Sequence, residues 1–184
     1  MNTPADIAAE ILRSGGVIAY PTEGVFGLGC LPCDDAAVRR VLSIKNRDAS
    51  KGLILIATDT SQLDPWIDLP DNTLLPEPVE NRPVTWIVPA SSRVTDLVRG
   101  NNSGVAVRLT NNPIAQSICS AVKSAIISTS ANLSGQSVAK DQSGLSRQFG
   151  CLVDYIVPGE CGPASKPSEI RVLATGQILR HGNQ

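Results

Sequence analysis

The feature that most constrains the fold is a short, unbroken apolar run, LILIA, at residues 53–57. It has the length of a strand and no polar residue interrupts it, which indicates a strand buried on both faces. A second short run, residues 125–127, has the same character. Strands of this kind occur where helices cover both faces of a sheet. The chain is therefore expected to form an α/β fold, in which helices flank a mixed sheet.

Local signals place the other elements around these two strands. Thr3-Pro4-Ala5-Asp6 is typical of a helix start, and Ser14-Gly15-Gly16 of a helix end. Five prolines between positions 65 and 83 predict a surface excursion instead of a buried strand. Further helices are expected at residues 34–44 and 113–122. Further strands are expected at residues 17–20, 84–88, 105–109 and 152–157, followed by a terminal hairpin of residues 170–173 and 177–180.

Length and composition indicate one domain, residues 1–184. The chain of 184 residues lies in the single-domain range, and an apolar content of 42% suffices for one core. No run approaches the roughly 18 apolar residues of a membrane span, and the N-terminus lacks signal-peptide character. We therefore expect a cytoplasmic protein without membrane contact. Because 16 Lys and Arg balance 17 Asp and Glu, the net charge of −1 gives no overall attraction for nucleic acid.

Cysteine and histidine restrict the available chemistry. The five cysteines are an odd number, which favours free thiols over a paired disulfide framework. Cys30 and Cys33 have the spacing of a redox or zinc motif, but a lone pair at this spacing is a weak signal, and no metal ligands are predicted. A histidine-dependent triad or zinc motif would have to use His181, the single histidine, close to the C-terminus.

Two polar clusters flank the predicted buried strands. Lys45-Asn46-Arg47 precedes the run at residues 53–57, and Ser128-Thr129-Ser130-Ala131-Asn132 follows the run at residues 125–127. Arginine offers a planar fork for phosphate oxygens, lysine a point charge, and the serine and asparagine side chains offer donors. Neither a P-loop nor a complete Rossmann fingerprint is present. The clusters are therefore interpreted as a polyphosphate or carboxylate site.

Both clusters can also be interpreted as residues that stabilise the fold and bind no ligand. Lys45 and Arg47 follow a predicted helix, where cations complement the helix dipole. The hydroxyls of residues 128–132 could satisfy one another in a turn. A third candidate element is the turn Pro21-Thr22-Glu23-Gly24, where glycines at positions 24, 27 and 29 let the backbone approach another group closely.

Several segments together resemble the YrdC/Sua5 family, in the same order and with the same spacing. The KxR and SxN signatures carry most of the specificity. The segments are YPTEGVFGLG (20–29), IKNRDASKGLILIA (44–57), RPVTWIVPA (82–90), VAVRLTNNP (105–113), STSANLSG (128–135), VPGE (157–160), PSEIR (167–171) and TGQILRHG (175–182).

The resemblance implies a YrdC-like fold with a concave substrate cleft, and it implies a nucleotidyltransferase. Such an enzyme joins L-threonine, bicarbonate and ATP into L-threonylcarbamoyladenylate and releases pyrophosphate. The product serves the t6A modification at adenosine 37 of ANN-decoding tRNAs, through transferase proteins of the TsaB, TsaD and TsaE type. Mg²⁺ is expected to bridge the phosphates of ATP, although the sequence shows no dedicated acidic cage for it.

The family's functional positions can be carried over residue by residue. Lys45 and Arg47 are the implied catalytic residues, because displacement at a phosphate needs alignment and charge neutralisation more than a histidine base. The implied ATP ligands are Lys45, Arg47, Lys51, Ser130, Asn132 and Arg180. The implied threonine ligands are Thr22, Arg108, Ser128 and Ser168.

Three positions depart from the family pattern. Arg82 stands where relatives commonly have the glycine of a PGPxT loop, in the segment Asn81-Arg82-Pro83-Val84-Thr85. Gly24 stands where many relatives have a threonine, so this position offers no hydroxyl. Asp48 replaces a proline in the loop that follows the KxR signature.

Two alternative functions use the same cations. An RNA-binding module for double-stranded RNA or tRNA would also contact phosphates through Lys and Arg, although six aromatic residues and a net charge of −1 disfavour strong binding. The second alternative is other carbamoyl-adenylate chemistry, as in hydrogenase maturation, which usually comes with further fused segments. A fold alone does not decide among these functions.

Overall fold

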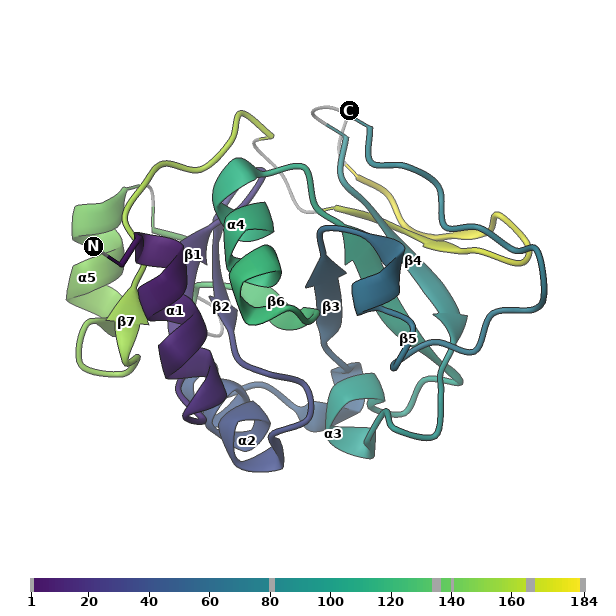
Figure 1. Cartoon of the computed structure of the whole chain (residues 1–184), viewed down its shortest axis with the longest axis horizontal. Coiled ribbons are helices and arrows are strands. Elements are labelled where there is room, and N and C mark those ends of the chain that lie inside the picture. The colour runs from purple at the N-terminus through teal and green to yellow at the C-terminus, as the bar shows by residue number, and fades with distance from the viewer. Residues whose placement is uncertain (1, 80–81, 134–136, 140, 165–167, 183–184) are drawn as a thin grey trace.

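The computed structural model describes residues 2–79, 82–133, 137–139, 141–164 and 168–182, and these residues form a mixed sheet flanked by helices (Figure 1). The sheet order is β7-β1-β2-β6-β3-β5-β4-β8-β9. Three pairs are parallel (β1 with β7, β3 with β5, β4 with β8) and the others are antiparallel, so the predicted fold class is confirmed. The strands are β1 (Ile18–Pro21), β2 (Phe26–Gly29), β3 (Ile54–Ala57), β4 (Val84–Pro89), β5 (Gly104–Leu109), β6 (Ile126–Ser130), β7 (Tyr155–Ile156), β8 (Glu169–Val172) and β9 (Ile178–Arg180).

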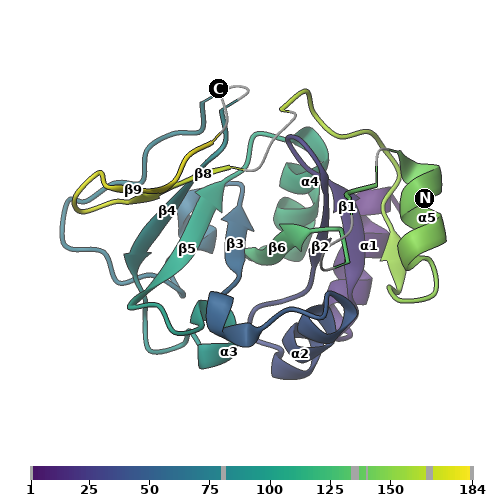
Figure 2. The same ribbon diagram turned by 180° about the vertical axis from the view of Figure 1, so that it is seen from behind.

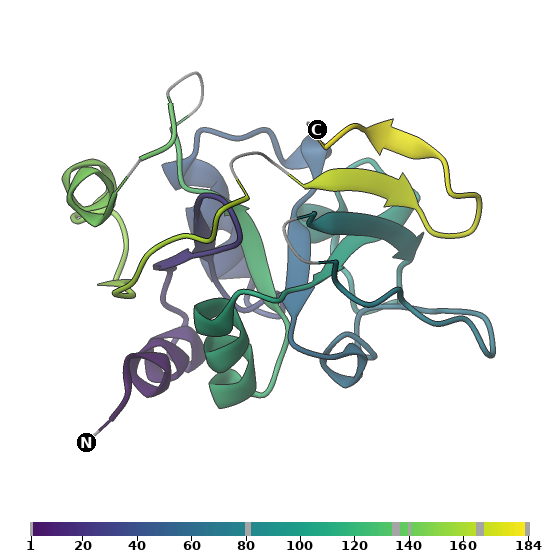
Figure 3. The same ribbon diagram turned by 90° about the horizontal axis from the view of Figure 1, so that it is seen from above.

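Helices cover both faces of the sheet. Seen from above in Figure 3, α1 (purple) and α4 (green) lie on one face and α2 (blue) lies on the other. The α-helices are α1 (Pro4–Arg13), α2 (Asp35–Ile44), α3 (Asp96–Arg99), α4 (Pro113–Val122) and α5 (Gln142–Phe149), and short 3-10 turns form at η1 (Ala49–Lys51) and η2 (Thr60–Gln62).

Neighbouring residues along the central strands alternate between two apolar clusters. In β1, Ile18 packs with α1 and α4, whereas Ala19 belongs to the cluster that contains α2. Ile56 and Leu55 of β3 divide between the same two clusters. Successive side chains of a strand point to opposite faces, so a strand covered on both sides has to be apolar throughout. The prediction from LILIA is therefore confirmed.

Three features differ from the sequence-based expectation. The strand predicted at residues 152–157 is limited to β7, because Leu152 and Val153 donate their N–H groups to Phe149 O and so complete the last turn of α5. β2 was expected to be part of a turn, since two of its four residues are glycines. The strand expected at residues 125–127 runs on to Ser130. Tertiary pairing overrides the weak strand propensity of glycine in β2.

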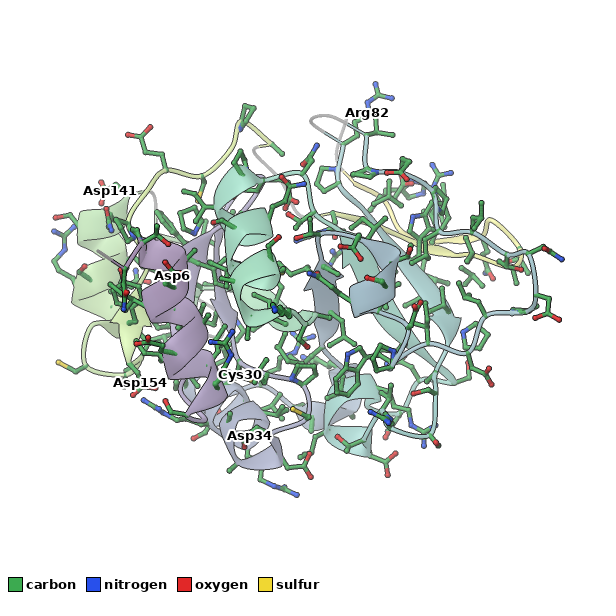
Figure 4. The ribbon with its side chains drawn as sticks, in the orientation of Figure 1. Asp6, Cys30, Asp34, Arg82, Asp141 and Asp154 are labelled. Atoms are coloured by element: carbon green, nitrogen blue, oxygen red, sulfur yellow. The ribbon has the colours of Figure 1, made fainter. Side chains whose placement is uncertain are left out.

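The edge of the sheet follows the prediction more closely. The terminal hairpin forms as β8 and β9, which pair antiparallel beside β4 (Figure 2). The proline-rich excursion forms no strand in its described part, although Trp66 and Leu75 anchor it in the core. Arg82 is exposed and points away from the body of the protein (Figure 4). Asn81, its neighbour in the altered loop, lies outside the described residues.

Acidic side chains begin several of the helices. Figure 4 shows Asp6, Asp34 and Asp141 at the starts of α1, α2 and α5. Asp34 Oδ1 accepts the N–H of Ala37 at 3.0 Å, and Asp141 caps α5 in the same way through Gly144 N. In α1, Thr3 is the cap: its Oγ1 accepts the N–H of Asp6, and Asp6 Oδ2 accepts the N–H of Thr3 in return. Such caps satisfy N–H groups that have no partner within the helix and place negative charge at the positive end of the helix dipole.

Asn112 caps α4 and also bonds to a distant segment. Its Oδ1 accepts the N–H groups of Ile114 at 3.0 Å and Ala115 at 3.1 Å. Its Nδ2 donates to Thr22 O at 3.0 Å, which links the start of α4 to the turn between β1 and β2. The side chain is 7% exposed. Asn112 therefore combines a local cap with a buried long-range hydrogen bond.

We expect Asn112→Ala to lower the free energy of unfolding by about 2 kcal/mol, about 1 from the cap and about 1 from the bond to Thr22. The matched control is Asp141→Ala, because Asp141 is exposed and caps α5 through Gly144 N at 2.7 Å. That control should lose only about 1 kcal/mol. Urea unfolding of both variants measures the difference, and equal losses would show that the link to Thr22 contributes nothing.

Candidate active site

A cavity of about 430 Å³ lies where several loops meet the ends of the strands. Among the sequence-predicted residues, all but Lys45 and Lys51 line it. They come from segments far apart in the chain, as the resemblance to the family requires. The predicted residues that line the cavity are Thr22, Arg47, Arg108, Ser128, Ser130, Asn132, Ser168 and Arg180.

Arg47 reaches the cavity from the loop after α2. The helix ends at Ile44, and the left-handed backbone of Asn46 (φ 46°) lets Arg47 N bond back to Leu42 O at 2.9 Å. The backbone of Arg47 therefore caps the helix, whereas its guanidinium donates from Nη2 to Gly52 O at 2.9 Å. Burial lowers the pKa of Arg47. Its buried Nε has no hydrogen-bond partner in the described part of the chain.

Lys45 has a different environment from the one expected. Its Nζ donates to the backbone oxygens of Ser130 and of Asn132, the latter at 2.9 Å, and lies 3.3 Å from Asn132 Oδ1. The side chain is 5% exposed and is not among the described residues that line the cavity. Burial, and secondarily the nearby Arg47, lowers the pKa of Lys45 to about 8. Lys45 therefore supports the 130–132 segment from behind.

Lys51 lies apart from the other predicted ligands. It is exposed at the end of η1, and Asp48 caps that short turn through the N–H of Ser50 at 2.9 Å. The proposed contact of Lys51 with ATP stays a prediction, because the structure does not bring this side chain to the cavity wall. The aspartate that replaces a proline at position 48 has a local role as a cap.

β6 brings hydroxyl groups to the cavity. Ser128 and Ser130 are two residues apart, so their side chains share one face of the strand. Ser128 is 5% exposed, whereas Ser130 is open to solvent and its Oγ lies 2.7 Å from Asn132 Oδ1. The expected alignment of residues 128, 130 and 132 along one wall is therefore found. The serine–asparagine bond is also the local turn contact that the alternative interpretation required.

Arg108 enters from β5 and pairs with a carboxylate that the sequence analysis did not select. Its Nη2 lies 3.3 Å from Glu23 Oε2, and both side chains are more than 90% buried. Thr110 Oγ1 donates to Glu23 Oε1 at 2.5 Å. The alternation Arg108, Thr110, Asn112 places all three side chains toward the 22–23 segment. That period of two was the available sequence signal for Thr110, whereas the pairing of Glu23 with Arg108 is a long-range contact.

The opposite wall is formed by β8 and β9. Ser168 Oγ lies 2.8 Å from Thr85 Oγ1, and Arg180 donates from Nη2 to Ser168 O at 2.7 Å. Partial burial lowers the pKa of Arg180, and the charges of Arg108 and Arg47 lower it further. The three guanidinium groups thus act on one another across a shared space.

The turn between β1 and β2 is fixed from several sides. Thr22 Oγ1 donates to Val25 O at 2.6 Å, and Thr22 O accepts from Gly162 N at 2.8 Å as well as from Asn112. A Cβ on Gly24 would lie 1.7 Å from Ala164 O. Glycine at position 24 is thus explained by the close approach of residues 162–164, and a threonine here would force this loop away.

The arrangement favours an anionic ligand. Of Lys45, Arg47, Arg108 and Arg180, only Arg108 has a carboxylate partner within the described residues. No group of three His, Cys, Asp or Glu suited to a metal ion occurs in that part of the chain. The five cysteines, all described, are free, and burial raises the pKa of Cys30 to about 12. The described helices include none long and apolar enough to cross a membrane.

Known proteins share both the sequence and the fold. A threonylcarbamoyl-AMP synthase of Nitrosococcus oceani is 47% identical over 183 residues, which cover 95% of each chain. One of Vibrio vulnificus is 46% identical over 179 residues, 94% of this chain and 95% of that protein. The structure of P. abyssi Sua5 complexed with L-threonine matches 97% of this chain with a TM-score of 0.85 at 28% identity. This chain spans 54% of that Sua5 chain.

The family comparison extends over nearly the whole sequence. The family Sua5/YciO/YrdC, described as "Telomere recombination", matches residues 10–182. That range contains both polar clusters, the turn between β1 and β2, and the terminal hairpin. The resemblance to the YrdC/Sua5 family is thereby confirmed, and the chain belongs to the Sua5/YciO/YrdC family.

Proposed function

We propose that the protein is an L-threonylcarbamoyladenylate (threonylcarbamoyl-AMP) synthase. It joins L-threonine, bicarbonate and ATP into threonylcarbamoyl-AMP and releases pyrophosphate, and residues 1–184 act as one YrdC-like domain. Relatives of nearly equal length carry this name at 46% and 47% identity. The observation that carries the proposal is the convergence of Arg47, Arg108 and Arg180 on one cavity. All three substrates are anionic or carry a carboxylate.

The proposed chemistry divides the cavity into two ends. Arg47, with Ser130, Asn132 and Arg180, binds the nucleotide and its phosphates. Arg108 binds the carboxylate of threonine, among the hydroxyls of Thr22, Ser128 and Ser168. The threonine ammonium releases a proton, the free amine forms a bond to the carbon of bicarbonate, and water leaves to give a carbamate. A carbamate oxygen then attacks the α-phosphorus, the bond to the bridging oxygen breaks, and pyrophosphate leaves. Guanidinium groups stabilise the negative charge that grows on the phosphorus oxygens.

The metal and the partners belong to the same proposal. Mg²⁺ bound with the nucleotide would neutralise part of its charge, and the phosphates themselves would hold it. The product passes to the t6A transferase machinery of the TsaB, TsaD and TsaE type in the cytoplasm. Contact with tRNA or double-stranded RNA is secondary, because the net charge of −1 gives little general attraction for RNA. Incubation with ATP, bicarbonate and labelled threonine, followed by detection of pyrophosphate and a labelled adenylate, tests the proposal.

Arg47→Lys should lower kcat/KM by about 10²-fold or more, mainly through kcat, because lysine cannot grip two phosphate oxygens at once. Pyrophosphate release measures the loss. The matched control is Arg39→Lys on the exposed face of α2, which should keep full activity. Melting temperatures show whether Arg47→Lys remains folded. A near-normal kcat in this variant would mean that the phosphates contact another residue.

Serine should replace threonine poorly as a substrate. A site that packs the threonine methyl loses about one buried methyl with serine, roughly 1 kcal/mol or several-fold in kcat/KM. Val25 and Val138 are among the apolar residues that line the cavity and can form such a contact. Pyrophosphate release with each amino acid at saturating ATP measures the ratio. Equal kcat/KM values would refute selection by the methyl group.

ATP binding should be accompanied by proton uptake near pH 8. Burial lowers the pKa of Lys45 to about 8, so part of the population is neutral there. Nearby phosphates favour the charged form and raise this pKa, so binding takes up about half a proton at pH 8 and almost none at pH 6.5. ATP affinity should accordingly fall as the pH rises above 8.

Titration calorimetry in buffers of different ionisation enthalpy measures the uptake. Lys45→Met should abolish it, whereas Lys123→Met, which alters an exposed lysine at the end of α4, should leave it unchanged. Uptake that persists in Lys45→Met would assign the proton to another group.

A further inference from the structure

Glu23 is an unexpected side chain in a cavity that attracts anions. It lines the cavity together with three arginines and is 7% exposed. A buried carboxylate is costly unless it is paired and hydrogen-bonded. Its negative charge also opposes the binding of phosphates and carboxylates nearby. Glu23 therefore needs an explanation that the nucleotide does not provide.

The carboxylate of Glu23 is held rigidly. Its Oε2 faces Arg108 Nη2 at 3.3 Å, and its Oε1 accepts from Thr110 Oγ1 at 2.5 Å. The backbone is fixed as well, because Glu23 O accepts from Ala164 N at 2.9 Å. These contacts come from β5, from the segment after β5 and from the 162–164 loop. The position of the charge is thus set before any ligand binds.

Glu23 retains capacity for a ligand. An ionised carboxylate accepts about four hydrogen bonds, and the described contacts of Glu23 with Arg108 and Thr110 leave part of this capacity for a donor in the cavity. Arg108 likewise presents five N–H donors. The pair therefore displays a fixed negative and a fixed positive group side by side on the cavity wall. An α-amino acid carries the complementary pair, since its ammonium and carboxylate sit on one carbon atom.

We propose that Glu23 binds the α-ammonium group of the amino acid while Arg108 binds its carboxylate, so that the pair selects zwitterionic α-amino acids over simple carboxylic acids. This inference rests on the proposed function, because it identifies the ligand of the same cavity. It adds a specificity-determining residue that touches the substrate. The competing explanation is that Glu23 only holds Arg108 in place.

The two explanations predict different ratios of the affinity for L-threonine to the affinity for (R)-3-hydroxybutyrate. 3-Hydroxybutyrate has the carboxylate, hydroxyl and methyl of threonine but lacks the amine. If Glu23 binds the ammonium, the protein prefers L-threonine to (R)-3-hydroxybutyrate by about tenfold or more, the scale of one charge-assisted hydrogen bond. Glu23→Gln, which keeps the shape and removes the charge, brings that ratio close to one. If Glu23 only positions Arg108, the variant weakens both ligands by the same factor.

Titration calorimetry of both ligands, in the presence of ATP, measures the ratio for the wild type and Glu23→Gln. Glu160→Gln, an exposed change in the loop that leads to residue 162, is the matched control and should keep the wild-type ratio. Glu23→Asp keeps the charge and should retain part of the preference for L-threonine over (R)-3-hydroxybutyrate. This variant also tests the inference if Glu23→Gln fails to fold. A wild-type ratio preserved in Glu23→Gln overturns the inference and leaves the proposed function intact. Failure of the wild type to bind threonine overturns both.

Discussion

The central feature of the structure is a set of wholly or partly buried cationic side chains that have no carboxylate partner among the described residues. Lys45, Arg47 and Arg180 donate mainly to backbone carbonyls, at residues 130 and 132, 52 and 168 respectively. A carbonyl satisfies a hydrogen bond but carries no net charge, so the positive potential in the cavity remains. Burial lowers the pKa of all three side chains, and neighbouring positive charges lower the pKa of Lys45 and Arg180 further. An anionic ligand would supply the negative charge that these cations lack within the protein.

The fold achieves this concentration because its central strands are buried on both faces. Residues of β1, β3 and β6 pack against helices on both faces, and the cavity lies among the segments at the strand ends. The cavity collects residues from the turn between β1 and β2, the loop after α2, β5, β6 and the β8–β9 hairpin. The pair Glu23–Arg108 joins the first of these segments to the third at the cavity wall. The arrangement of the cavity wall therefore depends on pairings between segments that are remote in sequence.

This dependence explains which parts were predictable. The run at residues 53–57 predicts a strand buried on both faces, because the apolar pattern that indicates it lies within the run itself. The KxR and SxN signatures could be carried over from the family, and Arg47 and Ser130 do meet at the cavity. β2 and Glu23 were missed, because the pairing of a glycine-rich strand and the partner of a carboxylate are long-range facts. Likewise, only the approach of Ala164 shows why position 24 is glycine.

Lys45 can contribute both to the structure of the 130–132 segment and to the binding of an anion. The sequence placed it with the phosphate ligands, whereas the structure places its Nζ on the backbone oxygens of Ser130 and Asn132, behind the wall that Ser130 and Asn132 form. An ammonium there donates to the backbone of the wall and adds positive charge close to the cavity. In the proposed function, phosphates in front of the wall would favour the charged form of Lys45, and the charged form donates to the wall, so binding of the anion would strengthen the contacts that shape its own site. We therefore expect the order of the 130–132 segment and the affinity for phosphate to be coupled through Lys45.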